Sequence, residues 1–167
     1  MFELKPLSPE AVERALEKAE RYRLLNEPAE AESICEDVLK VAPGNQEAMV
    51  TLLLALTEQF DGEGRAEAVP RARELVARLE DEYARAYYAG IVCERRAKAQ
   101  FKQGGPGSGS VAYESFRQAM AWYEKAEAVR PPGNDDALLR WNTCARIVAR
   151  SPSLVPAPQE TSEQPLE

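Results

Sequence analysis

The chain has 167 residues, which is enough for one folded domain with a continuous core. It carries a net charge of −7 and contains no histidine, the residue that serves most often as a general base and as a metal ligand. We therefore expect no catalytic site, cofactor or metal, and the acidic balance also disfavours nucleic acid as a partner. Since the sequence has neither an apolar run of 18 residues nor an apolar leader, it predicts a cytoplasmic protein without membrane insertion.

The first predicted element is a helical hairpin over residues 9–42. Ser8 and Pro9 are start signals for its first helix, in which apolar residues recur every three or four positions. A break at residues 26–28 separates it from a second helix, which must end before Pro43 because proline cannot continue a helix. The short turn requires the two helices to pack antiparallel.

A second hairpin is predicted from Gln46 to about Leu79. Its first helix is the most apolar segment of the chain, which places it in the centre of the domain. Residues 61–64 break the pattern with two glycines, and the partner helix follows. Pro70 falls in this partner helix, and we expect it either near the helix start or at a kink.

A third, longer hairpin is predicted from helices over about residues 82–102 and 111–129. Between them, residues 103–110 are a glutamine followed by glycines, serines and one proline, a composition that predicts a flexible loop. The stretch lacks the Gly-Lys-Ser/Thr ending of a phosphate-binding loop and follows no strand, so a linker is the better interpretation.

The last predicted helix covers residues 134–148, begins with an Asn-Asp cap, and covers the end of the third hairpin. The tail over residues 151–167 has four prolines and no apolar periodicity, which predicts disorder. The folded domain is therefore expected to span residues 1–150.

Charge is distributed unevenly along the chain. Residues 1–62 hold 13 acidic and 6 basic side chains, whereas basic side chains are densest between Arg65 and Lys102. A surface with two such poles can orient the approach of a charged protein, although helices also carry charges simply to solvate their outer faces.

The three cysteines, Cys35, Cys93 and Cys144, are far apart and lack the CxxC spacing of metal and redox sites. Each falls on an apolar face of a predicted helix. We therefore expect buried free thiols in a reducing compartment.

Two helices share one spacing, in which a small residue, a larger one, and a small or apolar one precede a proline. The members are Ala119, Tyr123, Ala126 and Pro131 in one helix, and Ala31, Cys35, Val38 and Pro43 in the other. This spacing resembles the second helix of a tetratricopeptide (TPR) repeat. The chain is thus similar to a TPR protein with about three degenerate repeats and a capping helix.

The resemblance implies an all-α, right-handed superhelix of three antiparallel hairpins plus a C-terminal capping helix. It also implies a concave groove along the first helices, in which a peptide or helix of a partner protein binds. The groove residues that it implies are Glu13, Glu17, Glu20, Val50, Leu54, Glu58, Tyr87, Tyr88, Ile91, Arg95, Arg140, Thr143 and Arg146.

The function that follows is a non-catalytic protein–protein interaction module, an adaptor or accessory subunit of a larger assembly. Two alternatives stay open: a small acidic TPR chaperone of a bacterial secretion or assembly system, and a self-associating subunit that dimerises through Trp122 or Trp141. An enzyme could in principle hold a metal on Glu13, Glu17 and Glu20. Without Glu-x-x-His pairs, however, these glutamates are better explained as a solvated helix face.

Overall fold

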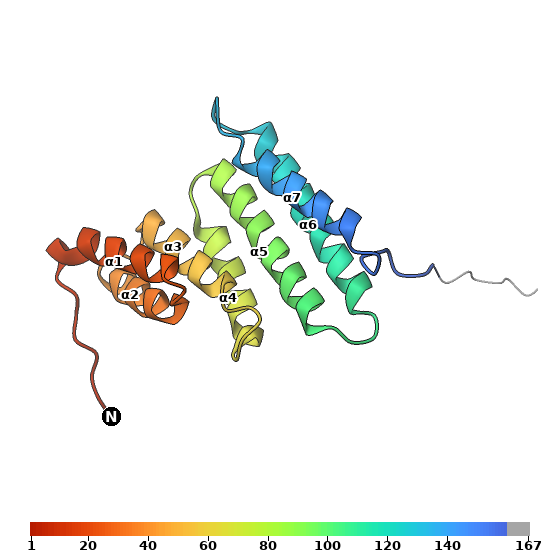
Figure 1. Ribbon diagram of the computed structural model, residues 1–167. Coiled ribbons are helices and arrows are strands. Elements are labelled where there is room, and N and C mark those ends of the chain that lie inside the picture. Colours follow the sequence, from red (N-terminus) through yellow and green to blue (C-terminus); the bar gives the residue numbers. More distant parts are fainter. Residues whose placement is uncertain (160–167) are drawn as a thin grey trace, which may run out of the picture.

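The computed structural model describes residues 1–159, without the side chain of Arg65 (Figure 1). Within this part the chain is all-α, as predicted, and contains no strand. The elements are η1 (Pro9–Ala11), α1 (Val12–Leu24), α2 (Pro28–Val41), α3 (Gln46–Thr57), α4 (Arg65–Arg78), α5 (Glu82–Gln103), α6 (Ser108–Ala128) and α7 (Asp136–Arg150). No helix among the described residues has the length and apolar character needed to cross a membrane.

Local signals in the sequence explain where several helices begin. The side chain of Asn45 accepts a hydrogen bond from the amide of Ala48 (2.9 Å), and Asp81 does the same for Ala84 (2.8 Å), so α3 and α5 have side-chain caps. Pro28 occupies the first turn of α2, where a missing N–H costs nothing. Ser8, which we expected to cap the first helix, makes no such bond, and η1 precedes α1 instead.

Pro70 lies inside α4, six residues into the helix, rather than at its start. The helix begins at Arg65 after Gly64, whose left-handed backbone (φ 77°) ends the preceding loop. Because proline has no N–H, the carbonyl of Ala66 loses its usual helical donor. The ring of Pro70 lines a surface groove that is described below.

The helices follow one another in space in chain order, from α1 at one end of the molecule to α7 at the other (Figure 1). Each helix packs on the next, and α3 also contacts α1 and α5. The central helix α3 buries most of its surface, as its apolar sequence predicted.

Two hydrophobic clusters hold the fold together. The first lies among α1 to α4, reaches Val92 of α5, and includes the buried Leu16, Leu53 and Leu75. The second lies among α5, α6 and α7, around Phe116 and Tyr123. The partly buried side chains of Leu54 and Tyr88 pack against both clusters and join them.

The pair α5–α6 owes its close packing to Gly90. A Cβ at this position would overlap the ring of Tyr123, which is fully buried. Glycine is therefore needed here for the approach of the two helices rather than for a turn.

The glycine-rich loop is shorter than predicted. Helix α5 continues to Gln103 and α6 begins at Ser108, so residues 104–107 alone form the connection, and 108–110 belong to the first turn of α6. Gly109 lies directly against the carbonyl of Ser153, a close contact that a side chain would obstruct. Residues 108–110 are thus partly packed where the sequence suggested a free linker, whereas residues 104–107 are exposed.

The chain remains packed beyond the predicted domain end at residue 150. A turn closed by the Leu154 amide and the Ser151 carbonyl (3.0 Å) places Leu154 in the second cluster, where it is 2% exposed. One large apolar side chain can dock in this way without the periodicity that marks a helix. The predicted disorder of the tail beyond this point includes residues 160–167, which lie outside the described residues.

Candidate functional site: a groove between α4 and α5

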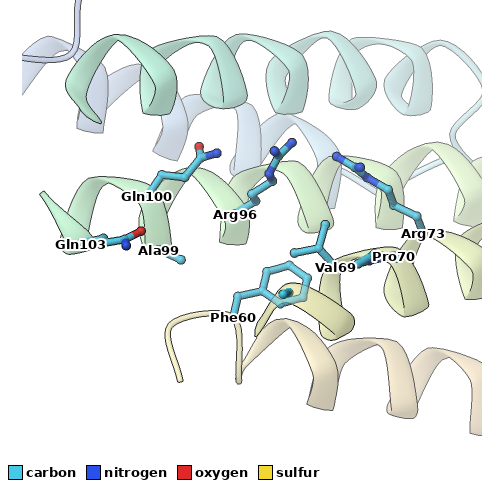
Figure 2. Close-up of a pocket in the computed structure, with 9 residues that line it drawn as sticks. Phe60, Val69, Pro70, Arg73, Arg96, Ala99, Gln100 and Gln103 are labelled. Atoms are coloured by element: carbon cyan, nitrogen blue, oxygen red, sulfur yellow. The ribbon is translucent and has the colours of Figure 1, made fainter. Parts of the chain in front are cut away.

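A surface groove runs between α4 and α5 and is made of two neighbouring hollows of ≈ 350 and ≈ 390 Å³. The first is lined by Phe60, Ala66, Val69, Pro70, Arg73, Arg96, Ala99, Gln100 and Gln103 (Figure 2). The second is lined by Arg73, Val76, Ala77, Arg85, Ala89, Val92, Cys93 and Trp122. Because Arg73 belongs to both, we treat them as one feature, the α4–α5 groove.

The spacing of the lining residues explains why the groove is continuous. On α4 they recur every three or four positions from Ala66 to Ala77, and on α5 they do so from Arg85 to Gln103, so each helix contributes one face. At 1.5 Å per residue, the α4 face is about 16 Å long. A partner helix of three turns matches this length.

The floor of the groove is apolar. Phe60 and Val92 are buried at its base, and Val69 and Val76 are half-buried beside them. Trp122 of α6 closes one side and is 37% exposed, with the ammonium of Lys125 4.4 Å from its ring centroid. Exposed apolar surface between charged edges is a feature of protein-binding sites.

The charged residues of the groove are all arginines, namely Arg73, Arg85 and Arg96. Arg85 donates to the carbonyls of Leu79 (2.9 Å) and Glu80 (2.8 Å) just beyond the end of α4. Among the described residues, Arg73 and Arg96 form no ion pair with a carboxylate. Figure 2 shows their side chains extending toward each other from the two helices. The groove thus presents positive charge beside an apolar floor.

Cys93 lines the groove as a free thiol. Burial raises the pKa of its thiol, although the positive charges of Arg73 and Arg96 oppose that shift. The other two cysteines are fully buried, and burial raises the pKa of both Cys35 and Cys144 to about 12. All three are free thiols, as predicted, although Cys93 is half-exposed rather than buried.

The predicted groove residues are distributed over several places. Five of them, Glu17, Glu20, Val50, Leu54 and Tyr88, line a different hollow of ≈ 650 Å³ formed by α1, α3 and α5. Glu58 and Arg95 line a smaller hollow near the end of α3. Glu13 and Arg146 are exposed on the outer helices.

The remaining predicted residues make contacts within the fold. Ile91 is 2% exposed and belongs to the second cluster, and Tyr87 stacks on Tyr83 (ring centroids 5.7 Å apart). Thr143 donates to the carbonyl of Leu139 within α7 (3.0 Å). Arg140 turns inward to the buried carboxylate of Glu94.

The Glu94 carboxylate is the centre of a buried network that joins α5, α6 and α7. It is 0% exposed and receives hydrogen bonds from Lys98 (2.9 Å), Arg140 (2.9 Å), Tyr123 (3.1 Å) and Cys144 (3.4 Å). Burial alone would raise the pKa of Glu94, but its hydrogen bond to Lys98 and the charges of Lys98 and Arg140 lower it overall. The Glu94 carboxylate is therefore charged at neutral pH, and its hydrogen bonds hold the three helices together.

The chain is an all-α domain with apolar, charge-edged grooves on its surface, which are features of a protein-interaction module. A family model, that of the DnaB-helicase binding domain of primase, matches residues 52–95, about a quarter of the chain. No curated protein and no solved structure matches the chain. The family matched by this segment is a binding domain, which agrees with the prediction that the chain is a module that interacts with another protein.

The resemblance to TPR repeats is wrong. The matched segment starts within α3, contains all of α4 and ends within α5, so it crosses the boundary between the second and third predicted repeats, and the comparisons give no TPR evidence. The spacing misled because any closely packed antiparallel helices need small residues at their contacts. Tyr123, for instance, packs against α5 at Gly90, and Ala119 is buried in the same cluster.

Sequence reasoning missed the α4–α5 groove because the resemblance placed the binding groove along the first helix of each hairpin, whereas α4 is a second helix. A usable signal was present in the excess of basic residues between Arg65 and Lys102. Arg73 and Arg96, which lie in this segment, flank the apolar floor of the groove.

Proposed function

We propose that the chain is a non-catalytic docking module for a replicative helicase of the DnaB type, and that the α4–α5 groove is the contact surface. The observation that carries this proposal is the position of the matched segment. Residues 52–95 include every groove residue of α4, and on α5 they include the groove residues from Arg85 to Cys93.

The chemistry of the groove favours an amphipathic helix with acidic residues as the helicase element. Its apolar side would cover Val69, Val76 and Val92, and its carboxylates would pair with Arg73 and Arg96. Arginine suits this task because its planar group binds a carboxylate through two hydrogen bonds. Apolar burial would supply affinity, while the arginines would set the orientation and speed of docking.

In this role the chain acts as an adaptor or accessory subunit that connects the helicase to other proteins. The proposal includes the cytoplasmic location predicted from the sequence, and it needs no contact between the chain and nucleic acid.

The proposal is tested by measuring the affinity of the purified chain for a DnaB helicase from the same organism. The double variant Arg73→Glu/Arg96→Glu should weaken binding at least about tenfold, because it replaces attraction with repulsion at the edge of the groove. Arg117→Glu is the control, since Arg117 is exposed on α6 and does not line the groove.

Thermal unfolding of each variant separates loss of binding from loss of folding. We expect little change in the melting temperature, because neither arginine of the groove makes an ion pair with the described residues. Equal helicase affinity for the folded double variant and for the wild type would refute the proposed surface.

A further inference from the structure

The hollow of ≈ 650 Å³ on α1, α3 and α5 is a second groove, which we name the acidic groove. Its floor is apolar: Leu16 is 3% exposed, and Val50, Leu54 and Tyr88 are half-buried around it. Because these side chains come from three helices of the packed domain, the floor is fixed before any partner arrives.

The rim of this groove has the opposite charge to that of the α4–α5 groove. It carries the carboxylates of Glu17, Glu20 and Glu47, and Arg23 as its single cation among the lining residues. The guanidinium of Arg23 is already occupied, since it binds Glu20 (2.9 Å) and Glu58 (2.6 Å). In the described part of the chain, Glu17 and Glu47 form no ion pair.

The long-range field agrees with the local charges. Residues 1–62, which include all of α1 and α3, carry seven more acidic than basic side chains, the same excess as the whole chain. Such a field attracts a cationic ligand and repels an acidic one before contact.

We infer that the acidic groove binds a second protein through a basic amphipathic segment, with lysines or arginines on the glutamate rim and apolar residues on the floor. The inference does not depend on the helicase proposal, because a different set of side chains carries it. The two grooves select ligands of opposite charge, so an acidic helix suited to Arg73 and Arg96 would be repelled here. The chain can thereby hold two different partners at once.

The test uses a fluorescein-labelled amphipathic helical peptide of leucine and lysine, with a leucine–glutamate peptide of equal length as its counterpart. Fluorescence anisotropy should show binding of the leucine–lysine peptide and none of the counterpart. The variant Glu17→Lys/Glu47→Lys should weaken binding at least about tenfold. Glu74→Lys/Glu114→Lys changes the net charge equally at exposed positions outside the groove, and should bind within about twofold of the wild type.

Three results would overturn the inference: no binding of the leucine–lysine peptide, equal losses in the two double variants, or a concentration-dependent dimer that Glu17→Lys/Glu47→Lys dissociates. The last would mean that a second copy of the chain fills the groove. Peptide binding that persists in Arg73→Glu/Arg96→Glu would support the inference whatever happens to helicase binding. The two proposals can therefore fail separately.

Discussion

The two halves of the molecule are stabilised in different ways. In α1 to α4, short helices of 12 to 14 residues surround an apolar cluster, and the buried polar side chains are the hydroxyls of Thr51 and Thr57. In α5 to α7, longer helices surround the buried rings of Phe116 and Tyr123 and the fully buried, ionised Glu94. The first half depends on apolar burial, whereas the second combines close helix contact with a charged network.

This difference explains where the α4–α5 groove lies. Helix α5 is shared by the two clusters, since Val92 belongs to the first cluster while its neighbour Ile91 belongs to the second. Most apolar side chains of each half are buried within that half. An apolar depression therefore remains at the surface between α4 and α5. A partner that fills this depression would contact both halves.

Replacing Glu94 should have the largest effect on stability. Glu94→Ala leaves Arg140 without its buried partner, and we expect a loss of about 4 kcal/mol in the free energy of unfolding. Urea unfolding followed by circular dichroism measures this loss. A loss below about 1 kcal/mol would show that the network contributes little to the second half.

The same carboxylate predicts a dependence on pH. The pKa of Glu94 is lower in the folded protein than its ordinary value of 4.5. Its contribution to stability is therefore complete well above pH 4.5 and is lost as the pH falls through the folded pKa. Unfolding curves of Glu94→Gln should show a smaller loss in this acid range than those of the wild type.

Leu53→Ala provides the matching change in the first half. Leu53 is fully buried in the centre of the first cluster, and its truncation leaves a cavity, so we expect a loss of about 3 kcal/mol. Because no charge is involved, the difference from the wild type should be the same at pH 7 and pH 5. A strong pH dependence would contradict the assignment of the two halves.

Gly90→Ala tests the close approach of α5 and α6. The added methyl group would overlap the Tyr123 ring, and we expect destabilisation of about 2 kcal/mol, measured by thermal unfolding. Gly44→Ala is a matched control, because a Cβ there meets no atom within 4 Å. Similar effects of both changes would indicate that helix separation at Gly90 is not important.

The sequence predicted the positions of the helices far better than it predicted which of their side chains are buried or line a groove. The breaks at Pro28 and Pro43 and the apolar composition of α3 were sufficient to locate these elements, because such signals act within one helix. The burial of Glu94 was not predictable, since its partner Arg140 is 46 residues away and meets it only through tertiary packing.

The candidate site was missed for a related reason. The α4–α5 groove joins helices that the repeat pattern assigned to different hairpins, and its key pair, Arg73 and Arg96, is separated by 22 residues in sequence. By contrast, five of the residues that the repeat resemblance placed in a groove do gather in the acidic groove, because side chains three or four positions apart share one face of a helix.

Hydrogen–deuterium exchange of the chain with and without a DnaB helicase tests the central claim most directly, because it locates the contact without any substitution. We predict that binding protects the amides of α4 and of α5 from Arg85 to Arg96, while α1 and α2 exchange as in the free protein. Protection confined to α1 and α3, or to α6 and α7, would contradict the assignment of the α4–α5 groove as the helicase-binding surface.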